Sequence, residues 1–118
     1  MADKTYLDWP FFEDRHRELA AKLDDWAASN IKGINHEDVD AACRDLVARL
    51  ASGDWLRHAA VDPADAGSKL DVRSLCLIRE TLARYDGLAD FSFAMQGLGS
   101  GAISLFGTND QKDNWLPK

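Results

Sequence analysis

Residues 93 to 107, FAMQGLGSGAISLFG, place three glycines within one apolar segment. Gly97, Gly99 and Ala102 have the spacing of the G-x-G-x-x-A turn that holds the pyrophosphate of a dinucleotide. That turn needs a strand before it and a helix and an acidic residue after it, and 118 residues leave no room for such a unit. The nucleophile elbow G-x-S-x-G around Ser100 lacks its first glycine. The sequence therefore predicts neither a dinucleotide-binding turn nor a serine nucleophile.

The three histidines, His16, His36 and His58, lie on separate segments without the H-E-x-x-H spacing or the cysteine partners that zinc sites use. We expect no metal site and interpret each as a surface or cap histidine. Neighbouring acids such as Asp24 and Asp25 are interpreted as solvated helix faces, because a catalytic pair of carboxylates needs a cleft that nothing in the sequence predicts. We therefore expect no catalytic residue in this chain.

The glycine-containing segment is predicted to be helical, where each glycine costs about 1 kcal/mol relative to alanine. At 100° per residue it has two neighbouring faces. The small-residue stripe comprises Ala94, Gly97, Gly101 and Ser104, and the apolar stripe comprises Phe91, Met95, Leu98, Ala102 and Leu105. Ser92, Gln96 and Ser100 lie roughly opposite. A stripe without large side chains lets another group approach the backbone, and the pattern alone favours a neighbouring helix over a ligand.

The rest of the chain predicts helices that position this segment. Apolar residues at helical spacing indicate a first helix over residues 9–31, with Pro10 in its first turn. A cap at Asn35 and Asp38 precedes a second helix, which Gly53 ends. The connector 53–70 is structured and holds a short helical turn at 55–59.

The third helix begins after Asp71 as its N-cap and stops at Gly87. The fourth spans 88–106, Gly107 caps its end, and the capping-box spacing of Thr108 and Gln111 opens a fifth helix that reaches Trp115. No segment alternates apolar and polar residues as a strand would, and no repeat is present. The fold class is all-α, an antiparallel bundle of about five helices in a single domain, 1–118.

Composition narrows the class of protein. The chain is 46% hydrophobic and 29% charged, with a net charge of -6, so it has no basic surface for nucleic acid. Neither a signal peptide nor a membrane span is predicted, which favours the cytoplasm. Cys43 and Cys76 are expected to be reduced and to pack in or near the core.

Two stretches resemble the N-terminal domain of the acyl-CoA dehydrogenase family. LCLIRETLARYDGLADFSFAMQ, residues 75–96, is similar to the family's helix pair that ends in the helix lining the substrate's acyl chain. FGTNDQKDNWLPK, residues 106–118, resembles a recurrent ending whose matching positions are Phe106, Gly107, Thr108, Asp110, Gln111, Lys112, Leu116 and Pro117. The opening helix and the connector also fit that domain in length and order.

The resemblance implies α,β-dehydrogenation of an acyl-CoA thioester, in which a glutamate removes the α proton and FAD takes the β hydrogen as hydride. This is a step of fatty acid metabolism, and an oxidase of the same superfamily is equally compatible. The chain stops before the β-barrel domain that holds much of the flavin and before the C-terminal helical domain that carries the glutamate. Alone it is expected to be inactive, and the full-length protein is expected to be a homo-oligomer.

On this resemblance, Phe91, Ala94, Met95 and Leu98 form one wall of the acyl-chain pocket. The flavin-binding residues, the acyl-chain length and the electron acceptor stay open. The alternative is a free-standing helical interaction module whose small-residue stripe receives a partner helix. If the chain is a domain of a larger enzyme, a contiguous apolar patch should be exposed on it.

Overall fold

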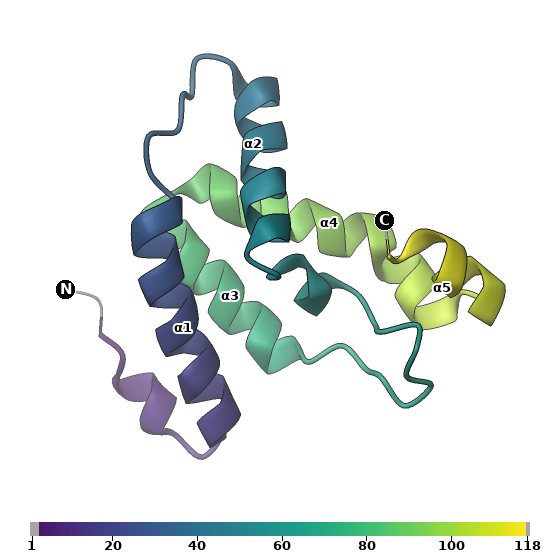
Figure 1. Cartoon of the computed structure of the whole chain (residues 1–118). Coiled ribbons are helices and arrows are strands. Elements are labelled where there is room, and N and C mark those ends of the chain that lie inside the picture. Colours follow the sequence, from purple (N-terminus) through teal and green to yellow (C-terminus); the bar gives the residue numbers. More distant parts are fainter. Residues whose placement is uncertain (1–2, 118) are drawn as a thin grey trace.

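The computed structural model describes residues 3–117, and within that range it contains helices and no strands. Two 3-10 helices, η1 and η2, accompany five α-helices (Figure 1). In chain order the elements are η1 (Thr5–Asp8), α1 (Asp14–Asn30), α2 (Val39–Ser52), η2 (Leu56–Ala59), α3 (Val72–Tyr85), α4 (Gly87–Phe106) and α5 (Asn109–Trp115). The all-α prediction is confirmed.

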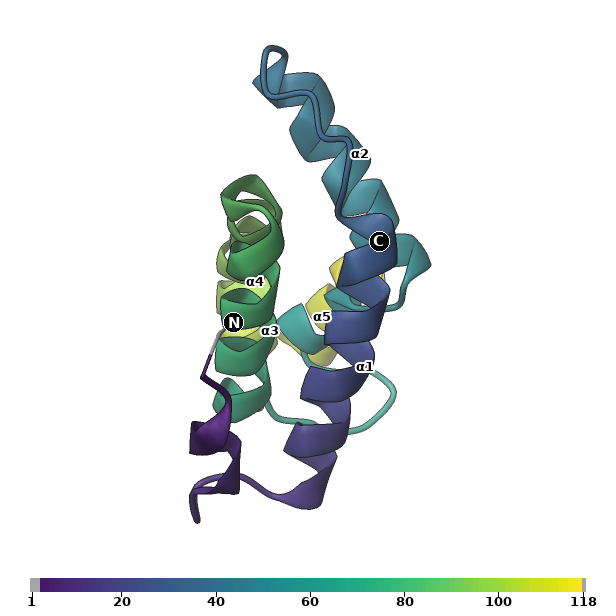
Figure 2. The ribbon, with the colours of Figure 1, turned by 90° about the vertical axis from the view of Figure 1, so that its left-hand side faces the viewer.

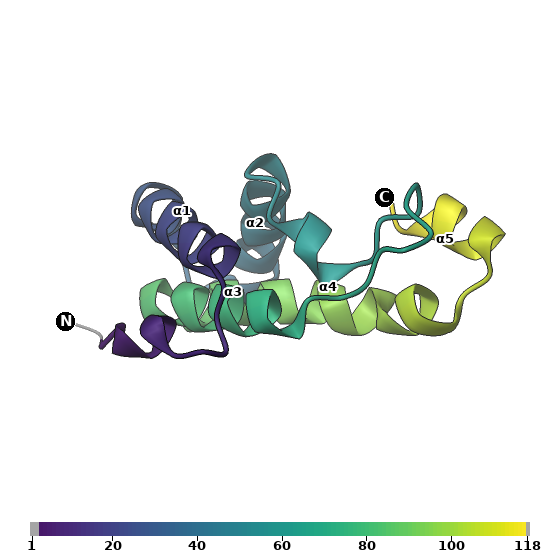
Figure 3. The same ribbon diagram turned by 90° about the horizontal axis from the view of Figure 1, so that it is seen from below.

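The helices form a flat, two-layered slab that measures 44 × 41 × 18 Å along its principal axes. Figure 3 shows α3 and α4 along one side of the slab, with α1, α2 and α5 on the other. Figure 2 shows the same separation, with α1 and α2 facing the α3–α4 layer. Helix α1 packs on α3, and α2 packs on α4. The outer side of the α3–α4 layer is therefore left without a covering helix.

The core lies between the two layers. Each of the four long helices contributes two fully buried side chains, four residues apart, to one cluster. These are Leu23 and Ala27 of α1, Leu46 and Leu50 of α2, Ile78 and Leu82 of α3, and Ala89 and Phe93 of α4. Spacing of four places both members on one helix face, and burying a leucine or phenylalanine contributes about 1.5–3 kcal/mol.

The first helix begins at Asp14, so the predicted start around Pro10 was wrong. Glu13 is the N-cap, and its side chain and that of His16 form a reciprocal capping box. The Arg17 guanidinium donates to two main-chain oxygens of the preceding segment, at 2.6 and 3.2 Å. These bonds hold that segment as η1 and a turn instead of helix.

The boundary between α3 and α4 also differs from the prediction. Gly87 is the first residue of α4 and does not terminate α3. Asp86 separates the helices because its backbone is extended (φ -160°), and its carboxylate accepts from the main-chain N–H of Leu88. An aspartate that caps the next helix ends the previous one without a glycine.

The other predicted elements are present. The helical turn at 55–59 is η2, α4 ends at Phe106 with Gly107 as its cap, and Thr108 and Gln111 form the capping box of α5. Both cysteines are free, but Cys76 is exposed and not near the core as expected. Within residues 3–117 no helix has the length and apolar character needed to cross a membrane.

Candidate functional site

The apolar stripe of α4 faces outward, on the uncovered side of the slab. Phe91 is 52% exposed, Leu98 72% and Leu105 60%. Met95 and Ala102 are exposed between them. Large side chains normally face the core of a helical protein, so this stripe is a contiguous apolar surface of the kind that marks a binding or domain interface.

The opposite side of α4 is the buried one. Ser92 and Ser104 are buried there with Phe93, whereas the sequence pattern indicated a polar face opposite the stripes. Ser104 accepts from the main-chain N–H of Val61 at 3.3 Å, so part of this polarity is satisfied by the connector. The hydroxyl of Ser92 has no hydrogen-bond partner within the described chain. Helix α4 thus buries two serines beside Phe93 and exposes most of its large hydrocarbon side chains.

The glycines of α4 have different surroundings. A Cβ placed at Gly97 would lie 3.8 Å from the main-chain oxygen of Ala59, an ordinary contact with η2. Around Gly99 and Gly101 a Cβ would meet nothing within 4 Å. Alanine would therefore fit at all three positions, so the packing of this domain does not require glycine at any of them.

The structure brings the four predicted acyl-contact residues together on about two turns of α4. Phe91, Met95 and Leu98 are exposed, and Ala94 is half-buried beside them. From Phe91 to Phe106 the helix carries no ionisable side chain. This surface can bind a hydrocarbon and exclude water, and it holds no group that could transfer a proton. The role of these residues as an acyl-chain wall stays a prediction.

An ion pair lies at the N-terminal end of the apolar stripe, and sequence analysis missed it. Arg79 of α3 donates through Nε to Asp90 Oδ1 at 2.8 Å and through one terminal nitrogen to Oδ2 at 3.0 Å. The hydrogen bonds that Arg79 donates to Asp90 raise the pKa of Arg79, which stays charged. Asp90 precedes Ala94 by one helical turn, and this spacing could have identified its place beside the predicted wall.

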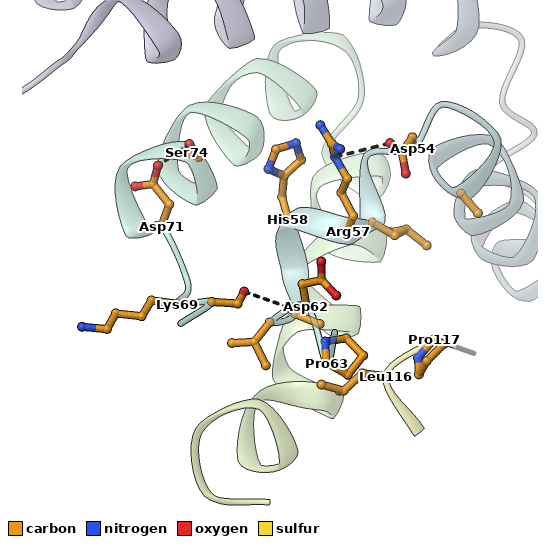
Figure 4. A pocket seen from close by; sticks show the side chains of 15 residues that line it. Asp54, Arg57, His58, Asp62, Pro63, Lys69, Asp71, Ser74, Leu116 and Pro117 are labelled. Carbon is orange, nitrogen blue, oxygen red and sulfur yellow. Dashed lines mark hydrogen bonds and ion pairs between the residues drawn. The ribbon is translucent and has the colours of Figure 1, made fainter. Parts of the chain in front are cut away.

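A cleft lies elsewhere, between the connector, the start of α3 and the end of the described chain at Leu116 and Pro117 (Figure 4). Its volume is about 810 Å³. None of the predicted acyl-contact residues lines it. Charged side chains line it together with apolar ones such as Leu56, Val61 and Leu116, and Lys69 points away from the others in Figure 4.

Much of the charge around this cleft is paired within the protein. Asp71 Oδ2 accepts from Ser74 Oγ at 2.7 Å, from His16 Nε2 at 3.0 Å and from Arg15. Burial alone would raise the pKa of Asp71, but these hydrogen bonds outweigh it and hold the pKa well below its usual range. The Arg57 guanidinium lies 3.3 Å from an oxygen of Asp54.

Two histidines lie near the cleft. His16 is a cap histidine, as the sequence analysis expected, although it is fully buried and not at the surface. Its Nδ1 accepts from the main-chain N–H of Glu13, which leaves the proton on Nε2 for Asp71. Burial, together with the charge of Arg57, lowers the pKa of His58, whose ring stacks on Trp55. Because its pKa is lowered, the His58 ring is neutral at neutral pH. This ring lines the cleft.

This cleft suits a hydrocarbon chain less well than the stripe does, because charged side chains lie among its apolar ones. An alkyl group that covered Asp62 would remove the hydration of its carboxylate. No group of three or more His, Cys, Asp or Glu side chains in residues 3–117 is arranged to hold a metal ion. The outer face of α4 is therefore the better candidate for binding an apolar ligand.

Comparison with known proteins gives one family. A search of curated proteins gave no match. Residues 13–118 match the family described as acyl-CoA dehydrogenase, N-terminal domain. That range includes α1 to α5, the connector and the outward-facing stripe. The chain therefore belongs to the acyl-CoA dehydrogenase family, of which it carries the N-terminal domain.

Proposed function

We propose that this chain is the substrate-pocket domain of a flavin-dependent acyl-CoA dehydrogenase and that the outer face of α4 forms one wall of the acyl-chain pocket. The observation that carries the proposal is the exposed apolar stripe, on the side of α4 that no other part of the slab covers. Phe91, Ala94, Met95 and Leu98 are the proposed contacts. Family membership supports an acyl-CoA thioester as the substrate.

The proposed task of α4 is binding and orientation. Each methylene that the stripe removes from water contributes about 0.8 kcal/mol, so an acyl chain of several carbons could be held by apolar contact alone. Such binding would fix the position of the thioester end relative to the catalytic groups. Holding reacting groups in the right orientation accelerates a reaction. The stripe contributes no acid or base to the chemistry.

FAD is the cofactor that the family generally uses, and it would accept the β hydrogen of the substrate as hydride. The described residues alone do not fit it. The large cleft is lined by charged groups that are mostly paired internally, and the face of α4 offers no polar group for a flavin ring or a pyrophosphate. We propose that further domains of a longer polypeptide hold the flavin and supply the catalytic base.

Anaerobic mixing tests this proposal. The natural polypeptide that carries this domain is purified and its flavin absorbance is followed after addition of saturated acyl-CoA esters. We expect the flavin band to bleach with at least one ester and to stay unchanged with free coenzyme A. A colourless protein, or a flavin that no acyl-CoA reduces, would reject the proposed function.

The spacing of the apolar stripe favours a second candidate. Phe91, Met95, Leu98, Ala102 and Leu105 follow one another at alternating steps of four and three, as the core positions of a coiled coil do. A helical interaction module would bind a partner helix through them. Sedimentation of a colourless chain in complex with a helical partner, with no acyl-CoA binding, would favour this candidate.

A further inference from the structure

The Arg79–Asp90 ion pair stands at one end of an otherwise uncharged helix face. Asp90 lies one turn before Ala94 and two turns before Gly97, in line with the small-residue stripe, and it directly precedes Phe91 of the apolar stripe. Its partner Arg79 belongs to the neighbouring helix α3. An acyl chain that follows the stripe toward the N-terminus of α4 would therefore end against this pair.

The pair presents donors and not acceptors. Both oxygens of Asp90 already accept a hydrogen bond from Arg79, and the Asp90 side chain is 19% exposed. The Arg79 side chain is 54% exposed, and its second terminal nitrogen, Nη1, has no acceptor within the described residues. A guanidinium has five N–H groups in a planar fork, so several remain for a ligand oxygen.

The fold does not depend on this pair alone. Arg79 is half-exposed, and the α3–α4 hairpin is also held by Leu82 and Phe93 in the core and by the Asp86 cap. If the acyl chain ended in a methyl group, it would cover the free N–H groups of Arg79, and their hydrogen bonds to water would be lost without replacement. If it ended in an oxygen acceptor, that oxygen would accept hydrogen bonds from the same N–H groups.

We infer that Arg79, held in place by Asp90, selects acyl chains that carry an oxygen acceptor at the end remote from the thioester, a hydroxyl or a carboxylate. This inference rests on the proposed acyl-binding role of α4. Arg79 acts here as a specificity-determining residue and takes no part in the dehydrogenation itself.

The test compares three acyl-CoA esters of equal chain length, with a methyl, a hydroxyl or a carboxylate at the remote end. Values of kcat/KM are measured for the natural flavin-containing polypeptide, for Arg79→Met, which keeps the length of the side chain, and for Asp90→Asn. Arg57→Met, which removes an exposed arginine paired with Asp54, is the control. Thermal melting checks that each variant is folded.

We expect the wild type to prefer the oxygenated esters by about tenfold, and Arg79→Met to lose this preference while the methyl ester is oxidised as well as before. Asp90→Asn removes a negative charge, so the carboxylate ester should gain relative to the hydroxyl ester. The control should keep the wild-type preference. Should Arg79→Met fail to fold, Asp90→Asn still tests the inference through the expected gain of the carboxylate ester relative to the hydroxyl ester.

A wild type without preference, or an equal loss for all three esters in Arg79→Met, would overturn the inference and leave the proposed function standing. Oxidation of no acyl-CoA ester at all would reject both. The two failures are thereby distinguished.

Discussion

Two glycines show how the surroundings of one residue decide what it does. A Cβ at Gly53 would lie 2.7 Å from the ring of Trp55 and 2.8 Å from that of Trp26, so the indole pair requires a glycine there. A Cβ at Gly101 would meet nothing. The first glycine serves the packing of this domain, and the second leaves space on a surface that the domain itself does not fill.

Replacing these glycines by alanine should have opposite effects on the free energy of unfolding of the isolated chain. Gly101→Ala should stabilise it by about 1 kcal/mol, because alanine is the better helix former and the site is open. Gly53→Ala should destabilise it by about 1–3 kcal/mol through overpacking against the indoles. Urea denaturation measures both, and equal effects of the same sign would contradict this account of the two sites.

The ion pairs and hydrogen bonds of Asp71 predict how the free energy of unfolding changes at acid pH. Its pKa is lower in the folded chain than in the unfolded chain, so the folded state binds fewer protons. The stabilisation is present above the unfolded pKa of about 4 and is lost as pH falls toward the folded pKa. Asp71→Asn should cost about 2–3 kcal/mol at neutral pH and should make stability less steep below about pH 4.

Unfolding free energies measured across this acidic range check the prediction. Asp25→Asn, at an exposed position on α1, is the matched control and should keep the wild-type profile. An unchanged acid profile in Asp71→Asn would mean that the cluster with His16, Ser74 and Arg15 does not hold the carboxylate in its charged form.

At the scale of elements, α4 is unusual in the direction of its amphipathicity. Ser92 and Ser104 pack inward beside Phe93, and most of its other large apolar residues face solvent. A helix with this arrangement gives up hydrophobic stabilisation within its own domain, which supports the proposal that the outward stripe binds a ligand or another domain. Such a surface also promotes self-association when it is left uncovered.

Polar substitution in the stripe should therefore cost the isolated chain little. Leu98→Gln is expected to change the free energy of unfolding by at most about 0.5 kcal/mol and to reduce the fluorescence of a hydrophobic dye. The control Leu46→Ala, in the core, should cost about 2–5 kcal/mol. A large loss of stability in Leu98→Gln would show that the stripe is already covered in solution.

At the scale of the whole molecule, sequence patterns predicted where the helices lie better than they predicted which side of each helix is buried. The capping box at Thr108 and Gln111 and the helical periodicity of α4 are local signals, so the structure confirms them. The end of α3 was assigned to Gly87, because the sequence analysis looked for a glycine after the helix. It overlooked Asp86, whose side chain accepts a hydrogen bond from the main-chain N–H of Leu88 and caps α4.

The missed features depend on residues far apart in the sequence. Buried His16 donates from Nε2 to Asp71, the N-cap residue of α3, and Arg79 reaches Asp90 only once α3 and α4 fold back on each other. Helical periodicity placed Phe91, Met95 and Leu98 on one face, and all three are exposed, but it could not tell which side of α4 the layers cover.

The central claim is that the outer face of α4 contacts an acyl chain, and a chain-length series tests it most directly. Values of kcat/KM are measured for saturated acyl-CoA esters of increasing length with the natural polypeptide, with Ala94→Leu and with the control Ala48→Leu, at an exposed site on α2. We expect Ala94→Leu to reduce oxidation of the longest esters by about tenfold or more while the shortest are spared, because the added methylenes occupy chain space. An identical length profile in all three proteins would contradict the claim.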